Sequence, residues 1–160
     1  MSPDEPVESE GMLQIVLDPD PRLKKVCRKV EVFGTPELIS QVGRMTETMY
    51  AYQGIGIAAN QVGFDNRVIV VAKNPEKFPN TTPLALINPV IQTRSKKKQI
   101  LREGCLSFPA KTKMRRRSAS VRIIAYDLSG NKFSWQAKGL AAQCIQHEID
   151  HINGKTMMDR

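Results

Sequence analysis

The stretch Gln146-His147-Glu148-Ile149-Asp150-His151 holds both histidines of this 160-residue chain. Apolar residues recur at helical spacing through it, and Asn153-Gly154 follows, which predicts an amphipathic helix over residues 140–151. Residues four apart on a helix share a face, with Cβ atoms roughly 5–6 Å apart. Two imidazoles at this spacing can bind one metal ion, and Glu148 can reach a water molecule on that ion. The segment therefore predicts a metal-binding helix.

The residues before this helix predict another helix and then several strands. Thr35 is a helix N-cap with Pro36 at the first helical position, and the apolar spacing continues to about residue 52. The other predicted segments are a helical turn and an extended piece over 21–30, strands at 67–72, 84–91 and 99–101, and a hairpin of 120–127 with 132–136. Pro89 predicts an edge strand or a bulge. Because helices and strands do not alternate, we expect an α+β fold with antiparallel strands packed around the C-terminal metal-binding helix.

Composition is that of an ordinary globular domain, with 41% hydrophobic and 25% charged residues. We expect residues 1–11, which are polar and acidic, to be a disordered leader, and residues 12–160 to form a single catalytic domain. No apolar run approaches the roughly 20 residues of a membrane span. The three cysteines are odd in number and irregularly spaced, which favours a reducing compartment and hence a cytoplasmic location.

The net charge of +8 is concentrated in two basic runs, residues 96–98 and 111–117. The first is Lys-Lys-Lys, and the second contains two lysines and three consecutive arginines. Two interpretations remain open for these runs. They form either a solvated face or a docking surface for a polyanion such as RNA.

Two cysteines are candidates for a third metal ligand. Cys144 lies on the same helix as the histidines, but three ligands on one helical stretch make a poor tetrahedron, and buried helical cysteines commonly serve in packing. Cys105 lies in Glu103-Gly104-Cys105-Leu106-Ser107, between a strand and a turn bounded by proline, where Gly104 would let the backbone approach a metal closely. Cysteine with two histidines leaves a fourth position open to water, which is typical of a catalytic site. Taken alone, Cys105 could also be a half-buried packing residue.

A third cluster, Gly54-Ile55-Gly56-Ile57-Ala58-Ala59-Asn60-Gln61, is rich in small residues. It follows a helix and lacks the remaining elements of the dinucleotide and P-loop motifs, which excludes those assignments. The small residues let backbone lie against a ligand, and Gln61 supplies an amide donor. The alternative interpretation is a glycine-rich turn that caps a helix.

In this order, the three clusters resemble the peptide deformylase family, which carries Gly-x-Gly-x-Ala-Ala-x-Gln, then Glu-Gly-Cys-x-Ser, then Gln-His-Glu-x-x-His. The resemblance covers about residues 13–159. It implies removal of the formyl group from N-formylmethionyl peptides, with release of formate. The implied cofactor is one divalent ion, Fe²⁺ in the cell, replaceable by Zn²⁺, Ni²⁺ or Co²⁺. The implied roles are metal ligation by Cys105, His147 and His151, general base catalysis by Glu148, and oxyanion binding by the Gln61 side chain and the Leu106 N–H.

The resemblance also implies how the substrate binds. Further substrate-binding residues would be Gly54, Ile55, Gly56, Leu101, Glu103, Gly104, Leu140 and Cys144. Of these, Ile55, Leu101, Leu140 and Cys144 would form an apolar slot for the methionine side chain, with His147 at its back. Gly54 and Gly56 would bond to the peptide as an added strand. Gln143 departs from the family, in which an aliphatic residue is usual, and we expect its amide to narrow or wet the slot.

Many relatives continue past the metal-binding helix into another helix, which in some of them docks on the ribosome. This chain ends at Arg160 and resembles the short forms, some of which are phage-encoded, so a viral origin is one hypothesis. We expect the basic runs 96–98 and 111–117 to attract ribosomal RNA in place of that helix. No membrane and no specific DNA partner is expected.

Two competing functions are weaker. A His-Glu-x-x-His metallopeptidase needs a further His or Glu ligand after His151, and the last nine residues contain neither. A non-catalytic RNA-binding module would fit the positive charge but would leave Glu148 and Gln61 without a role.

Overall fold

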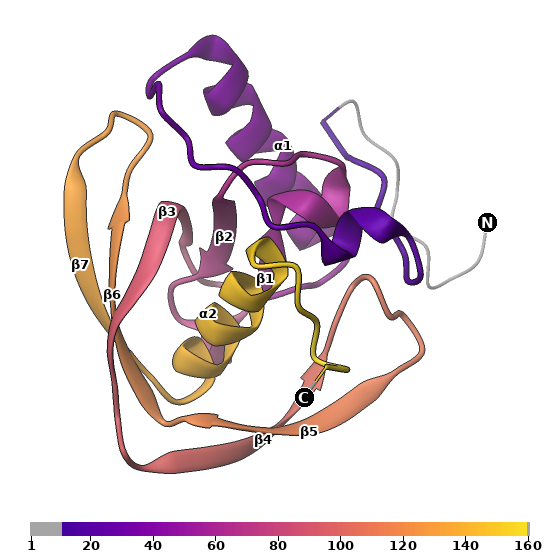
Figure 1. The fold of residues 1–160 in the computed structure, drawn as a ribbon, viewed down its shortest axis with the longest axis vertical. Coiled ribbons are helices and arrows are strands. Elements are labelled where there is room, and N and C mark those ends of the chain that lie inside the picture. Colours follow the sequence, from indigo (N-terminus) through magenta and orange to yellow (C-terminus); the bar gives the residue numbers. More distant parts are fainter. Residues whose placement is uncertain (1–10, 160) are drawn as a thin grey trace.

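The computed structural model describes residues 11–159, so the predicted leader lies outside the described residues except for Gly11, which is in a turn (Figure 1). The elements are η1 (Pro21–Lys24), α1 (Pro36–Ala51), β1 (Gly56–Ala58), η2 (Ala59–Val62), β2 (Val68–Ala72), η3 (Pro75–Lys77), β3 (Pro83–Arg94), β4 (Lys98–Gly104), β5 (Thr112–Ser118), β6 (Ser120–Tyr126), β7 (Lys132–Lys138) and α2 (Gly139–Ile152). No helix within the described range is long and apolar enough to cross a bilayer.

The strands form two antiparallel sheets around α2. One sheet has the order β1-β2-β3-β6-β7, and β4 pairs with β5 in a separate two-stranded ribbon. Figure 1 shows α2 in the centre of the view, with β1 and β2 above it, β6 and β7 to its left and the β4–β5 ribbon below. The predicted α+β fold, with antiparallel strands packed around the C-terminal helix, is confirmed.

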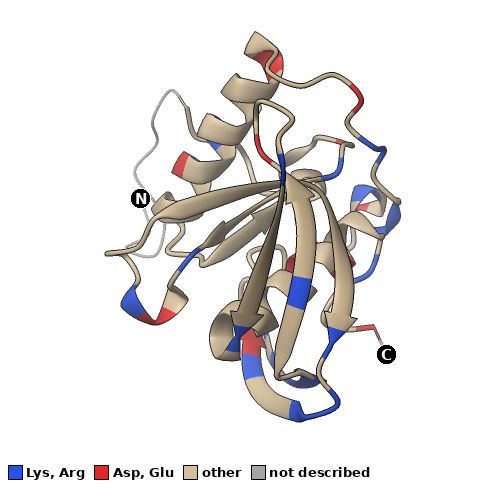
Figure 2. Cartoon of the chain, turned by 90° about the vertical axis from the view of Figure 1, so that its left-hand side faces the viewer, with Lys and Arg blue, Asp and Glu red and all other residues tan. Residues whose placement is uncertain are grey.

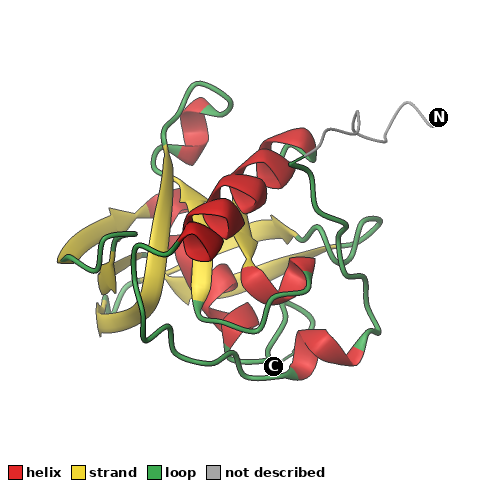
Figure 3. Cartoon of the chain, turned by 90° about the horizontal axis from the view of Figure 1, so that it is seen from above, coloured by secondary structure: helices red, strands yellow, loops and turns green. Residues whose placement is uncertain are grey.

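Strand β2 is buried on both faces and separates two apolar clusters. Ile69 and Val71 pack with α2, whereas Val68 and Val70 pack with α1. In Figure 3, which views the molecule from above, α1 lies across the strands. Burial of both faces explains why the sequence of β2 is a continuous apolar run, without the alternation that a half-exposed strand shows.

The structure contains the helix cap, the bulge and the hairpin that the sequence predicted. The Thr35 side chain accepts a hydrogen bond from the Leu38 N–H at 3.1 Å and caps α1. The bulge predicted near Pro89 is present as a register shift between Ile87 and Val90, where Asn88 has a φ of 51°. The predicted hairpin is β6 with β7.

Two strands were not predicted, and β3, β4 and β7 extend beyond their predicted residues. Strand β4 extends to Gly104, beyond the expected 99–101, because it pairs with β5 along its whole length. Strand β5, Thr-Lys-Met-Arg-Arg-Arg-Ser, has one apolar residue, so its sequence carries no apolar alternation. Strand β1 has only three residues and lies inside the glycine-rich cluster. These two unpredicted strands both border the site.

Candidate active site

The helix α2 presents His147 and His151 beside Cys105, which follows β4. Cys105 Sγ lies 3.2 Å from His151 Nε2, and the two Nε2 atoms are 3.2 Å apart. All three ligand atoms lie within 4.8 Å of one another. Metal–nitrogen bonds of about 2.0 Å and a metal–sulfur bond of about 2.3 Å put tetrahedral ligand atoms roughly 3.3–3.6 Å apart. The donor set therefore fits a tetrahedral divalent ion closely.

Cys144, the alternative ligand, is not part of this group. Its Sγ donates to the Ile55 carbonyl oxygen at 3.4 Å, and burial raises the pKa of its thiol well above the usual value. A protonated, hydrogen-bonded thiol is a packing group. The structure therefore brings together Cys105, and not Cys144, with the histidines.

In the absence of a metal, His147 holds a proton at neutral pH and His151 is neutral. Burial and the charge of His147 lower the pKa of His151 well below its usual value. Burial also opposes the charged form of His147, but the charge of Glu148 and contacts with Cys105 and Glu103 raise its pKa to about 10. A divalent ion bound between them would displace the proton from His147, so metal binding is expected to weaken as the pH falls.

Glu103 fixes the orientation of His147. Its Oε1 accepts hydrogen bonds from His147 Nδ1 at 2.8 Å and from Arg117 Nη2 at 2.9 Å, which leaves His147 Nε2 directed at the other ligands. Burial alone would raise the pKa of Glu103, but the hydrogen bonds from His147 and Arg117 lower it to about 2. Such a carboxylate–histidine pair fixes the tautomer of a metal ligand.

Arg117 completes this network and was not identified from the sequence. It is 8% exposed and bonds to Asp150 at 2.8 Å as well as to Glu103. Because it is buried, Arg117 belongs neither to a solvated face nor to a docking surface, the two interpretations left open for residues 111–117. The missing signal was the alternation of strand β5, which turns every second side chain toward α2.

Glu148 lies beside the ligands with a free carboxylate oxygen. The residue is 4% exposed, and its Oε1 has no hydrogen-bond partner among the described residues. Burial raises its pKa to about 7. Gly56 permits this placement, since a Cβ atom there would lie 2.6 Å from Glu148 Oε2. An unpaired buried carboxylate next to three metal-ligand atoms fits a site completed by an ion and its water.

Gln61 holds its amide against the Cys105 turn. Its Oε1 accepts the Ala58 N–H at 2.9 Å, and its Nε2 lies 3.2 Å from Ser107 Oγ and 3.4 Å from Cys105 Sγ. No backbone hydrogen bond within residues 11–159 uses the Leu106 N–H. The Gln61 amide and the Leu106 N–H thus both lie beside the thiol, and the Gln61 donor is held there by Cys105 and Ser107. Ser107, a partner of Gln61, had no predicted role, although it lies in the cysteine motif.

A cavity of about 850 Å³ opens onto these groups. The predicted residues that line it are Gly54, Ile55, Gly56, Gln61, Glu103, Gly104, Cys105, Leu106, Leu140, Gln143, Cys144, His147 and Glu148. Leu101 is not among its lining residues, which departs from the expected slot. A Cβ atom at Gly104 would meet no other atom within 4 Å, so close packing does not explain that glycine. Another cavity, of about 730 Å³ between α1 and residues 28–32, contains none of the predicted residues.

Strand β1 offers a free edge at this cavity. It is the terminal strand of its sheet and pairs only with β2. Gly54, Ile55 and Gly56 at its start line the cavity. An extended peptide can therefore be added along this edge by backbone hydrogen bonds.

This chain is similar to known proteins in both sequence and structure. The polypeptide deformylase family model matches residues 12–160. A peptide deformylase of Hahella chejuensis is 40% identical over 147 residues, covering 92% of this chain and 85% of that protein. The crystal structure of peptide deformylase from Thermotoga maritima has a TM-score of 0.86 at 36% identity, covering 93% of this chain and 97% of that one. A class I type b peptide deformylase from Acinetobacter baumannii, bound to Met-Ala-Ser, has a TM-score of 0.86 at 30% identity, covering 93% and 98%.

Proposed function

This chain belongs to the peptide deformylase family, a family of metallohydrolases, and removes the N-formyl group from nascent polypeptides; we propose that Cys105, His147 and His151 hold the metal ion for that reaction. The observation that supports this assignment is the convergence of Cys105 Sγ and the two Nε2 atoms beside the unpaired Glu148 carboxylate. We further propose that residues 12–160 form a single catalytic domain.

We propose Fe²⁺ as the ion in the cell, with Zn²⁺, Ni²⁺ or Co²⁺ as substitutes. One thiolate and two imidazoles suit each of these metals, and no hard oxygen ligand that would favour Mg²⁺ or Ca²⁺ belongs to the set. Such an ion, when bound, lowers the pKa of a water molecule and polarises the formyl carbonyl.

The residues of the chain supply the proton transfers and the oxyanion site. Glu148 accepts the proton of the attacking water as its oxygen bonds to the formyl carbon. The Gln61 side chain and the Leu106 N–H donate to the carbonyl oxygen as it becomes negative. Glu148 then delivers its proton to the amine nitrogen as the carbon–nitrogen bond breaks, and formate leaves.

The methionine side chain is placed in the apolar part of the cavity, against Ile55, Leu140 and Cys144 with His147 at the back. The peptide beyond it runs along the free edge of β1, where Gly54 and Gly56 bond to it. Support comes from the open edge and from the Met-Ala-Ser tripeptide bound by the Acinetobacter relative.

Release of formate from formyl-Met-Ala by protein purified without oxygen tests this function, because a ferrous thiolate centre oxidises readily. We expect formate and intact Met-Ala, with activity removed by a chelator and restored by Co²⁺. Cleavage between Met and Ala would indicate the metallopeptidase instead. Absence of both products from metal-loaded protein would leave only the RNA-binding module.

The pH dependence of kcat/KM is expected to follow Glu148. The base must be ionised to accept a proton, so kcat/KM should rise with pH and level off above the pKa. That pKa is about 7 without metal, and a bound cation lowers it, so the midpoint should lie below 7 in the Co²⁺ enzyme. Rates measured from about pH 5 to about pH 9 check this. If Glu148→Asp does not change the midpoint of this pH profile, the rise of kcat/KM with pH depends on another group.

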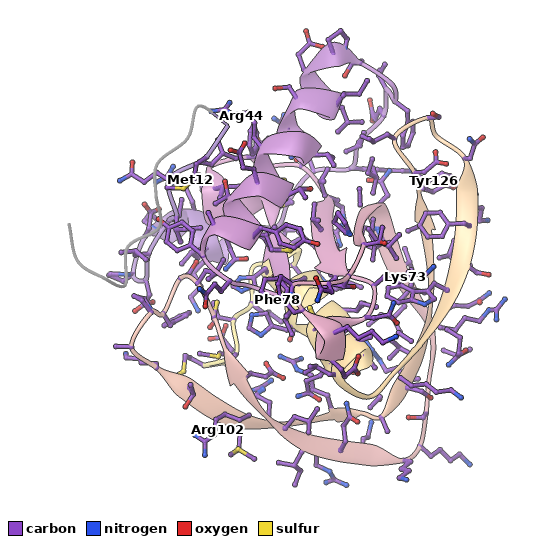
Figure 4. All side chains as sticks on the ribbon, turned by 180° about the vertical axis from the view of Figure 1, so that it is seen from behind. Met12, Arg44, Lys73, Phe78, Arg102 and Tyr126 are labelled. Carbon is purple, nitrogen blue, oxygen red and sulfur yellow. The ribbon has the colours of Figure 1, made fainter. Side chains whose placement is uncertain are left out.

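We also propose that the enzyme acts in the cytoplasm and docks on ribosomal RNA through the β4–β5 ribbon, since its substrates are nascent chains. Strand pairing joins the two basic runs, 96–98 and 111–117, on this ribbon. Its exposed cations are Lys96, Lys97, Lys98, Arg102, Lys111 and Arg116. Figure 4 places Arg102 at the outer side of the ribbon, and Figure 2 shows Lys and Arg segments gathered at the lower end of the molecule.

Neutralising part of this surface should weaken ribosome binding. We expect K96Q/K97Q/R116Q to reduce co-sedimentation with ribosomes and to reduce its dependence on salt, because fewer counterions are released. Formate release from short peptides should not change. The control K29Q/K73Q/K132Q removes the same charge from exposed lysines elsewhere. Equal binding by the two triple variants would show that net charge, and not this ribbon, is responsible.

A further inference from the structure

Gln143 is a buried polar residue of α2, one turn before the metal ligand His147. It is 2% exposed, and its neighbours in the sequence, Ala142 and Cys144, are buried as well. A buried amide lowers stability unless its donors and acceptor are paired. The partners of Gln143 therefore indicate what it does.

Both ends of the Gln143 amide are paired. Its Nε2 donates a short hydrogen bond to Glu103 Oε2 and another, of 3.1 Å, to the Arg115 carbonyl oxygen. Its Oε1 accepts from Gln99 Nε2 at 3.1 Å, and Gln99 in turn donates to the Gly139 carbonyl oxygen at 2.8 Å. The amide thus links α2 to both strands of the β4–β5 ribbon.

These contacts hold the Glu103 carboxylate from the side opposite His147. Glu103 Oε1 accepts from His147, while Oε2 accepts from Gln143 and from Arg117 Nε at 2.5 Å. With both oxygens occupied, the carboxylate cannot rotate without breaking a buried hydrogen bond. The ring of His147 is then fixed through its Nδ1.

We propose that Gln143 is a positioning residue for His147, acting through Glu103, so that His147 Nε2 is held in place to ligate the metal. This inference rests on the metal centre proposed above. Gln143 also lines the cavity that holds the methionine side chain, so the expectation that its amide narrows or wets that slot stays a separate prediction. Both N–H groups of Gln143 are used by the protein, so the amide presents no donor to a substrate side chain.

The test measures metal retention in a variant that keeps the size of the side chain. Met is unbranched like Gln but cannot donate to Glu103. We expect Q143M, loaded with Co²⁺, to lose the ion to a chelator roughly tenfold faster than the wild type, as for other outer-shell partners of metal ligands. The visible absorption bands of bound Co²⁺ should also shift, because His147 is less well oriented. The ratio of kcat/KM for formyl-Met and formyl-norleucine peptides should stay unchanged.

Two further variants make the result specific. Q99M removes the partner of Gln143 Oε1, together with the Gln99 bond to Gly139, but keeps the Gln143 bond to Glu103, so its loss of Co²⁺ should be faster than in the wild type and slower than in Q143M. Gln41 is also a buried helical glutamine, but it bonds to Asn66, away from the site, and Q41M is the matched control, with unchanged retention. Thermal unfolding of the metal-free proteins shows whether each variant is folded.

The proposal would be overturned if Q143M lost Co²⁺ no faster than the wild type and had the same absorption spectrum. A change confined to selectivity for methionine would also overturn it. If Q143M does not fold, the test rests on Q99M. Loss of Co²⁺ from Q99M at the wild-type rate would then overturn the proposal. If the wild-type protein itself binds no Co²⁺, the proposed metal centre fails, which is a different result from equal binding by wild type and variant.

Discussion

Replacing Glu148 with Gln is expected to lower kcat/KM for formyl-Met-Ala by roughly 10²–10⁴-fold and to leave the bound metal in place. The amide has nearly the same size and hydrogen-bonding reach as the carboxylate, but it cannot accept a proton from water. Glu148 is not one of the three ligating residues, so metal content should not change. Formate release and metal analysis of the same preparation check both parts.

The same substitution is expected to stabilise the metal-free protein at neutral pH. Burial raises the pKa of Glu148 from 4.5 to about 7, so the folded protein binds the proton more tightly than the unfolded chain. Stability is therefore lost as the pH rises from the unfolded value through the folded value. This cost is of the order of 3 kcal/mol above pH 7 and is absent in E148Q. Thermal unfolding of both proteins at acidic and neutral pH measures it.

Two outcomes would contradict this account of Glu148. A fully active E148Q would exclude the residue as the proton carrier. Loss of metal from E148Q would make it a ligand. E148D is the control for position, because its carboxylate is basic but set back by one methylene, so it should retain more activity than E148Q.

The sequence predicted best those elements whose signals are local. Both long helices, strand β2 and the β6–β7 hairpin follow from apolar periodicity, caps and turn residues within a few positions. The grouping of Cys105, His147 and His151 was also predictable, because the chemistry of metal ligation restricts the types and spacing of candidate ligands.

The network behind His147 depends on contacts that have no local signal. Glu103 and Arg117 meet because β4 and β5 pair, and strand β5 shows no apolar alternation since its inward side chains are Lys113, Arg115 and Arg117. A basic sequence of this kind is indistinguishable from a solvated surface until its strand partner is known. Likewise, the need for glycine at position 56 arises from Glu148, more than ninety positions later in the chain.

Replacing Cys105 with Ser is expected to remove the metal and to reduce formate release to background. A serine hydroxyl does not ionise near neutral pH and is a poor donor for Fe²⁺, Co²⁺ or Zn²⁺, so only two imidazole ligands remain. Metal content per protein after gel filtration and formate release measure the two effects. Added Co²⁺ should restore the chelator-stripped wild type but not C105S.

Cys105 is a sharper test of the centre than His151, because the two side chains differ in what they support. Cys105 lies in a turn and is only half-buried, so its change to Ser leaves the core intact. His151 is 0% exposed in the middle of the fold, and its truncation would confuse loss of metal with loss of packing. C144S is the matched control, since that thiol lines the same cavity but bonds to Ile55 and should keep its metal. Metal retained by C105S and lost by C144S would exchange the roles of the two cysteines and overturn the assigned ligand set.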